Sequence, residues 1–142
     1  MAKHHFDKLF TLEEANELTG TLEIPIRELQ RCTNELRGHL ARIFQLDPET
    51  KTMQLPKVVE RHPEVGPLAR RVGELASKIE SFGCFLKDVD LGLVDFPWEI
   101  EAENVVFLCW QPGEPRIIAW HPVEGGFGQR RPLPGAGKLY LN

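Results

Sequence analysis

The chain has 142 residues, of which 42% are hydrophobic and 27% are charged, and its formal net charge is −4. This length and balance predict one globular domain with a single core, and they argue against wholesale disorder. The acidic balance excludes nucleic acid as a general partner, because binding to phosphates needs clustered positive charge. Since no apolar run approaches a membrane span or a secretory signal, we expect one domain over residues 1–142, located in the cytoplasm and without a membrane partner.

The cysteines are Cys32, Cys84 and Cys109, and they are widely spaced. An odd count without a CxxC pair argues against a disulfide framework and against a structural zinc site. All three residues are interpreted as buried, reduced and inert thiols, which agrees with a cytoplasmic setting.

Residues 11–82 predict a long antiparallel helical hairpin. Thr11 and Glu14 have the spacing of a capping box, in which each residue binds the backbone of the other at the start of a helix. Gly20 and Pro25 then predict a break, with a short helix over 12–19 and a new helix from Thr21. One kinked helix is the alternative.

Two apolar stripes recur at three- and four-residue steps and would pair along the hairpin, with Gly83 as a stop after the second. Residues 46–63 contain three prolines and predict a floppy or functional connecting loop, most simply a tolerated insertion. The apolar residues of the two stripes cannot all be covered by pairing of the two helices alone. We therefore expect the sheet to cover part of them, or a second copy of the chain to do so in a homodimer formed through the helices. The stripes comprise Leu22, Ile26, Leu29, Leu36, Leu40 and Ile43, then Val65, Leu68, Val72, Leu75, Ile79 and Phe82.

Residues 84–122 predict a small antiparallel sheet of three or four strands, followed by a Gly/Pro-rich tail over 123–142. The fold class is therefore α+β. The stretch from Val105 to Trp110 is apolar on both faces, which predicts a central strand covered on each side. The candidate strands are Cys84–Lys87, Leu93–Ile100, Val105–Gln111 and Arg116–His121.

Simple hairpins about residues 102–104 and 112–115 give a predicted register. One row then contains Glu99, Val106 and His121, and the next contains Asp95, Trp110 and Ile117. A slip by one residue would send each side chain to the opposite face.

His121 is the most interesting single residue, because it ends an apolar strand and has several acidic residues nearby in the sequence. Imidazole and carboxylate together bind a divalent metal or act as an acid–base pair, and Asp95 and His121 are the candidate ligands. The plainer interpretation is a strand-end histidine that is satisfied by the backbone or by a carboxylate. The adjacent His4 and His5 are expected to bind metal only adventitiously.

A glycine loop from Gly125 leads into Arg130 and Arg131, and Glu114 lies in the preceding turn. Backbone amides and guanidinium groups in such a loop can bind a carboxylate or phosphate, so these three charged residues are candidates for binding a small ligand. A solvated or salt-bridged surface loop is the plainer interpretation. No Gly-Lys-Ser/Thr follows, so this is no Walker motif.

Several short motifs spread along nearly the whole chain resemble a bacterial family of uncharacterised proteins, domain of unknown function 2203. Gly20 departs from the proline expected after the first short helix. The resemblance implies a bacterial protein with helices followed by a sheet, and it supplies no activity. The motifs are Phe10–Asn16, Gly92–Pro97, Leu108–Trp110, Gly113–Pro115, Trp120–His121, Gly126–Phe127 and Arg130–Pro132.

Two functions remain open from the sequence. The first is a non-enzymatic interaction or scaffolding protein that acts through its helices, as a homodimer and without a cofactor. The second is a metal- or small-anion-binding protein, or a metal-dependent enzyme, that uses Asp95, Glu114, His121 and Arg130 near the end of the sheet. Neither hypothesis identifies a substrate or partner.

Overall fold

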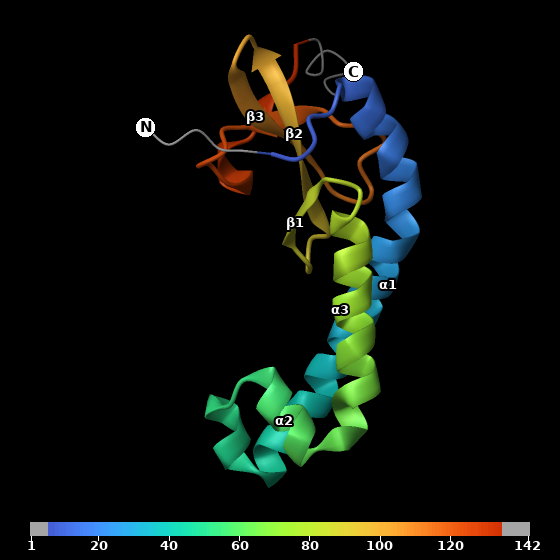
Figure 1. Ribbon diagram of the computed structural model, residues 1–142, viewed down its shortest axis with the longest axis vertical. Helices are drawn as coiled ribbons and strands as arrows, with labels where there is room; N and C mark the ends of the chain where they lie inside the picture. Colours follow the sequence, from blue (N-terminus) through green and yellow to red (C-terminus); the bar gives the residue numbers. More distant parts are fainter. Residues whose placement is uncertain (1–5, 135–142) are drawn as a thin grey trace.

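A computed structural model describes residues 6–134 and contains a helical arm attached to a five-stranded antiparallel sheet. The long helix α1 (Leu12–Leu46) and helix α3 (Gly66–Glu80) lie side by side and form the arm, which extends well beyond the sheet (Figure 1). No helix in the described part is long and apolar enough to cross a membrane. The predicted α+β class and the helical hairpin are confirmed.

Helix α1 begins at the predicted capping box and continues without interruption to Leu46. The amide of Glu14 donates to Thr11 Oγ1 at 3.0 Å, and the amide of Thr11 donates to Glu14 Oε1 at 2.9 Å. The predicted break between Gly20 and Pro25 is wrong, and the single-helix alternative is right. Pro25 lies on the buried side of the helix with Leu22 and Ile26, so burial of this apolar face outweighs the local cost of proline. The helix curves along its length (Figure 1), as long helices do around a core.

The connection between α1 and α3 is ordered, which corrects the prediction of a floppy loop. It contains the 3₁₀ helix η1 (Pro48–Thr52), helix α2 (Leu55–Arg61) and the 3₁₀ helix η2 (Pro63–Val65). The three prolines lie in the first turns of these helices, where a missing amide proton costs little. The connection packs on the end of the arm through a second small core formed by Leu36, Ile43, Val58 and Val65.

The strands of the sheet pair in sequence order. They are β1 (Phe85–Asp88), β2 (Leu93–Glu101), β3 (Asn104–Trp110), β4 (Ala119–His121) and β5 (Arg131–Pro132). Strand β3 is central, as predicted. Strand β5 comes from the predicted Gly/Pro-rich tail and was not expected; the amide of Leu133, directly after it, donates to the Ile118 carbonyl at 2.8 Å.

The predicted strand register is wrong by one residue at both hairpins. In the hairpin of β2 and β3, Glu101 pairs with Asn104 but Glu99 pairs with Val105. The register changes between these two pairs because a bulge adds one residue to β2 beside the turn. On the other side of β3, residues 111–118 form a longer irregular connection in which the amide of Ile117 donates to Asn16 Oδ1 of α1 at 2.8 Å. As a result Asp95, Cys109 and Ala119 share one row across the sheet, and Phe107 and His121 share the next row on the same face.

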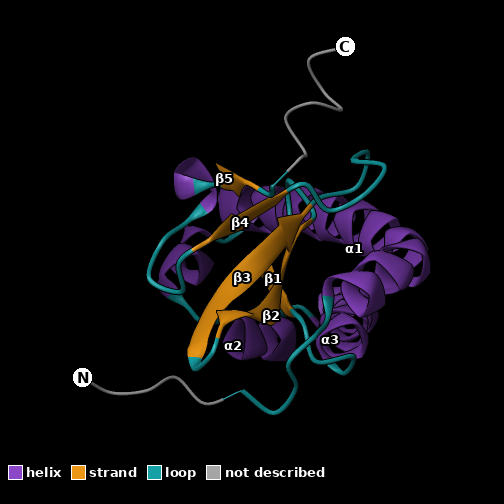
Figure 2. Cartoon of the chain, turned by 90° about the horizontal axis from the view of Figure 1, so that it is seen from above, coloured by secondary structure: helices purple, strands orange, loops and turns teal. Residues whose placement is uncertain are grey.

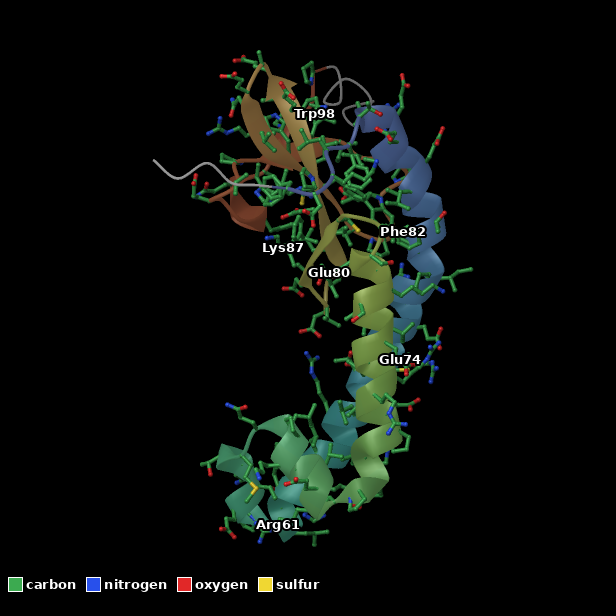
Figure 3. The ribbon with its side chains drawn as sticks, viewed as in Figure 1. Arg61, Glu74, Glu80, Phe82, Lys87 and Trp98 are labelled. Atoms are coloured by element: carbon green, nitrogen blue, oxygen red, sulfur yellow. The ribbon has the colours of Figure 1, made fainter. Side chains whose placement is uncertain are left out.

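The two faces of the sheet have different covers. Val94, Phe96, Leu108 and Trp110 pack into the main core together with α1 and α3, which lie on the same side of the sheet (Figure 2). The alternate residues of the strands face the other way. Side chains of this second face include Lys87, which points away from α1 (Figure 3) and lies 4.8 Å from the centre of the Phe107 ring.

Gly92 occupies a close approach between the β1–β2 turn and α1, and we expect Gly92→Ala to lower the free energy of unfolding by about 1–3 kcal/mol. Its φ is +70°, and a Cβ there would lie 2.8 Å from Pro112 Cδ and 2.9 Å from Ile26 Cγ2. Gly113 also has a positive φ, but a Cβ there meets nothing within 4 Å. Urea unfolding of Gly92→Ala and Gly113→Ala therefore separates steric overlap from backbone strain. Equal losses would show that the close approach to Ile26 and Pro112 has no energetic effect.

Candidate metal centre

A buried polar cluster lies on the second face of the sheet, and it is formed by Asp95 of β2, Cys109 of β3 and His121 of β4. The corrected register explains how they meet: Asp95 lies directly opposite Cys109, and His121 lies two residues beyond Ala119, the residue of β4 that pairs with Cys109, and so on the same face. The exposed fractions are 1% for Asp95, 0% for Cys109 and 2% for His121. Buried polar side chains of this kind need partners, so the contacts of each one decide what the cluster can do.

His121 is held on both of its ring nitrogens. Nδ1 lies 2.8 Å from the carbonyl oxygen of Pro122, and a carbonyl can only accept, so Nδ1 carries a proton and donates it. Nε2 lies 2.9 Å from Asp95 Oδ2. One proton must lie between these two atoms, either as imidazolium with carboxylate or as neutral imidazole with carboxylic acid.

Burial raises the pKa of Asp95 above its ordinary value, and the hydrogen bond with His121 opposes that rise. The second oxygen of the carboxyl group, Oδ1, has no hydrogen-bond partner among residues 6–134. The Cys109 thiol is close enough to interact with this carboxyl group, but a thiol is a weak donor. Asp95 is therefore a buried acceptor whose bonding capacity is only partly used.

The Cys109 thiol is protonated and is not set up as a nucleophile. Burial and the neighbouring Asp95 charge raise its pKa to about 12. A catalytic cysteine needs a lowered pKa and a basic partner, whereas His121 directs Nε2 at Asp95 and Nδ1 at a backbone carbonyl. This arrangement excludes a cysteine–histidine nucleophile for the metal-free cluster.

The donor atoms of the three side chains are close enough to share one metal ion, since they all lie within 4.8 Å of one another. One thiol sulfur, one imidazole nitrogen and one carboxylate oxygen form a mixed set that suits zinc and similar transition metals. The carbonyl of Pro122 fixes the tautomer that leaves Nε2 available as a ligand, which is how histidine ligands are commonly oriented. The unpartnered Oδ1 of Asp95 also fits a role as a metal ligand.

Glu114 and Arg130 form a second polar contact beside this cluster. Arg130 Nη2 donates to Glu114 Oε2 at 2.9 Å and to Oε1 at 3.1 Å. Glu114 Oε1 also accepts from the amide of Gln111 at 3.0 Å, and its carbonyl accepts from Trp110 Nε1 at 3.0 Å. The charges of Arg130 and Glu114 both reach the Cys109 thiol, with opposite effects on its pKa.

The structure thus brings the sequence-predicted site residues together in two pairs, Asp95 with His121 and Glu114 with Arg130. Arg131 lies apart from both, with its guanidinium 5.1 Å from the centre of the Trp120 ring. Cys109 was missed as a ligand candidate, because the predicted register placed it away from His121. The shift begins at the turn over residues 102–104, where Glu103 adopts a positive φ beside the bulge, and the residue types of this turn do not indicate it.

The chain belongs to the protein family described as "Uncharacterized conserved protein (DUF2203)", whose profile matches residues 8–133. The match includes every residue of the two polar pairs and Cys109, and it confirms the resemblance seen in the sequence. A search of curated proteins finds no match, and a search of solved structures finds none.

Proposed function

We propose that this protein binds a divalent transition metal, with zinc as the best chemical fit, through Asp95, Cys109 and His121. The observation that carries the proposal is the convergence of three different metal-binding donors within 4.8 Å at a fully buried position. The sulfur donor argues against calcium and magnesium, which prefer all-oxygen sites.

Charge and proton balance support this assignment. A bound ion would replace the proton shared by Asp95 and His121 and the proton of the Cys109 thiol. The resulting carboxylate and thiolate would together offset the two positive charges of the ion, so the buried cluster would remain neutral overall. A neutral cluster avoids the large cost of an unpaired charge in the interior.

The three ligands belong to β2, β3 and β4, so the metal would connect adjacent strands in the centre of the sheet. We assign metal binding and no reaction, because all three side chains are buried. A reducing cytoplasm in a bacterial cell, as expected from the sequence, would keep the thiol able to bind.

Elemental analysis of the full chain, expressed without an affinity tag and dialysed after loading with zinc, tests the proposal. We expect stoichiometric zinc in the wild type and its loss in Cys109→Ser and Asp95→Asn. Cys84→Ser is the matched control, because Cys84 is equally buried but donates to the Ile79 carbonyl at 3.2 Å, outside the cluster. His4 and His5, which lie outside the described residues, are replaced by alanine in every protein.

Two results would contradict metal binding at this cluster. One is a wild-type protein that retains no metal after loading. The other is equal zinc content in Cys109→Ser and Cys84→Ser, which would place the metal elsewhere.

A second candidate function is a helix-mediated interaction or scaffold, formed as a homodimer. Its support is the arm of α1 and α3, which projects from the sheet (Figure 1) and carries a hollow of about 420 Å³ between α1, η2 and α3. The ion pairs along this hollow, such as Arg71 with Glu28 at 2.7 Å, lie within the chain, so the surface is polar. Sedimentation at several concentrations tests the dimer, and a monomer at all of them would contradict it.

A further inference from the structure

The segment over residues 122–131 leads from β4 to the edge strand β5 and lies on the side of the sheet away from α1 (Figure 1). It begins at Pro122, whose carbonyl accepts from His121, and it includes the 3₁₀ helix η3 (Phe127–Gln129). The amide of Gly125 donates back to the Pro122 carbonyl at 2.8 Å, which closes a tight turn next to the cluster. Most residues of this segment are exposed, although the cluster beside it is fully buried.

One largely buried ion pair fastens the far end of this segment to the body of the sheet. The exposed fractions of the side chains are 18% for Arg130 and 13% for Glu114, and Arg130 donates to both carboxylate oxygens. The guanidinium also lies 4.8 Å from the centre of the Phe127 ring within the same segment. Glu114 also accepts from the amide of Gln111, so the anchoring carboxylate is held by the backbone of its own turn as well as by Arg130.

We infer that residues 122–131 act as a strap that closes the Asp95–Cys109–His121 cluster, with the Glu114–Arg130 pair as its clasp. When the clasp opens, the strap moves away from the sheet, and a hydrated metal ion or a small thiol reagent can reach Cys109. Local opening of this kind involves few buried apolar contacts and so precedes global unfolding. The metal part of this inference rests on the proposed function, whereas the access of a thiol reagent does not.

Alkylation of Cys109 in the metal-free protein measures opening of the strap directly. The full chain with Cys32→Ser and Cys84→Ser leaves Cys109 as the reporter thiol, and its rate of reaction with iodoacetamide is followed under native conditions. We expect Arg130→Gln to increase this rate by about tenfold or more, because it leaves the largely buried Glu114 carboxylate without a counter-charge and releases the clasp. Arg116→Gln is the control, since Arg116 is an exposed arginine on the neighbouring connection.

A second reporter separates local opening from loss of global stability. The chain with Cys32→Ser and Cys109→Ser reports on Cys84, which is buried next to Ile79 in the main core between the sheet and the helices. If the strap opens locally, Arg130→Gln accelerates the labelling of Cys109 and leaves that of Cys84 nearly unchanged. Equal acceleration at both cysteines, or no acceleration at Cys109, would overturn the inference.

The release of zinc to a chelator gives the metal-dependent test. Arg130→Gln is expected to speed this release by a similar factor while the bound zinc stays stoichiometric. Accelerated labelling of Cys109, combined with a wild-type protein that retains no zinc after loading, would uphold the strap and contradict the proposed function. Zinc that binds but leaves equally fast from Arg130→Gln and Arg116→Gln would contradict the strap alone.

Discussion

Replacement of His121 by alanine is expected to lower the free energy of unfolding of the metal-free protein by about 3–5 kcal/mol. His121 Nε2 lies 2.9 Å from Asp95 Oδ2, and both side chains are buried. Removal of the imidazole leaves the Asp95 carboxyl group with neither of its oxygens paired within the described residues. Urea denaturation of metal-free protein at neutral pH measures the loss.

The loss in His121→Ala should depend on pH in a defined direction. Burial raises the pKa of Asp95 above the ordinary 3.8, and the bond to His121 opposes the rise, so the variant has a still higher pKa. A folded-state pKa above the unfolded value gives stability that is full below 3.8 and is lost as the pH rises through the folded pKa. The deficit of the variant should therefore be small in acid and largest at neutral pH.

A double-mutant cycle controls for the loss of imidazole packing. We expect Asp95→Asn with His121→Ala to be destabilised less than the sum of the two single variants, because the interaction is removed only once. Additive losses, or a His121→Ala variant within about 0.5 kcal/mol of the wild type, would show that the pair is not coupled.

Replacement of Phe96 by alanine is the other change for which we expect a large effect, a loss of about 3–5 kcal/mol. Phe96 is fully buried in β2 on the face that packs against α1 and α3. Its ring meets the Phe10 ring edge to face, with centroids 5.2 Å apart. The substitution removes this contact and opens a cavity where the sheet, the start of α1 and the arm meet.

Thermal and urea unfolding of Phe96→Ala measure that loss, and Ile24→Ala is the control. Ile24 is an apolar residue of α1 that is 77% exposed, so its truncation should change stability by no more than about 0.5 kcal/mol. Similar losses in the two variants would contradict the placement of the main core between the helices and the sheet.

Much of the helical half could be predicted from the sequence, because its signals are local. The capping box at Thr11 and Glu14 and the two apolar stripes depend on neighbouring residues and on helical periodicity. The predicted break at Gly20–Pro25 failed because a propensity of this kind is outweighed when the helix face is buried against a sheet. The order of the connection between α1 and α3 was missed for a related reason. Its prolines were interpreted as signs of a loop, although each lies in the first turn of a short helix.

The candidate site was only half predictable. Asp95 and His121 could be identified as candidates from residue type, but their contact depends on the pairing of strands that are not adjacent in the sheet. One bulge in β2 and one irregular connection before β4 each shift the register by a residue. Together these shifts bring Cys109 onto the same face as His121, and no local pattern at Cys109 indicates this.

The most direct test of metal binding is the absorption spectrum of the full chain titrated with Co²⁺, which substitutes for zinc and reports on its ligands. The wild type and Cys84→Ser should develop a near-ultraviolet charge-transfer band from thiolate to cobalt, together with visible bands that saturate at stoichiometric metal. Cys109→Ser should lack the charge-transfer band. A wild-type protein without that band at saturating Co²⁺, or a band of equal strength in Cys109→Ser, would contradict a metal centre at Asp95, Cys109 and His121.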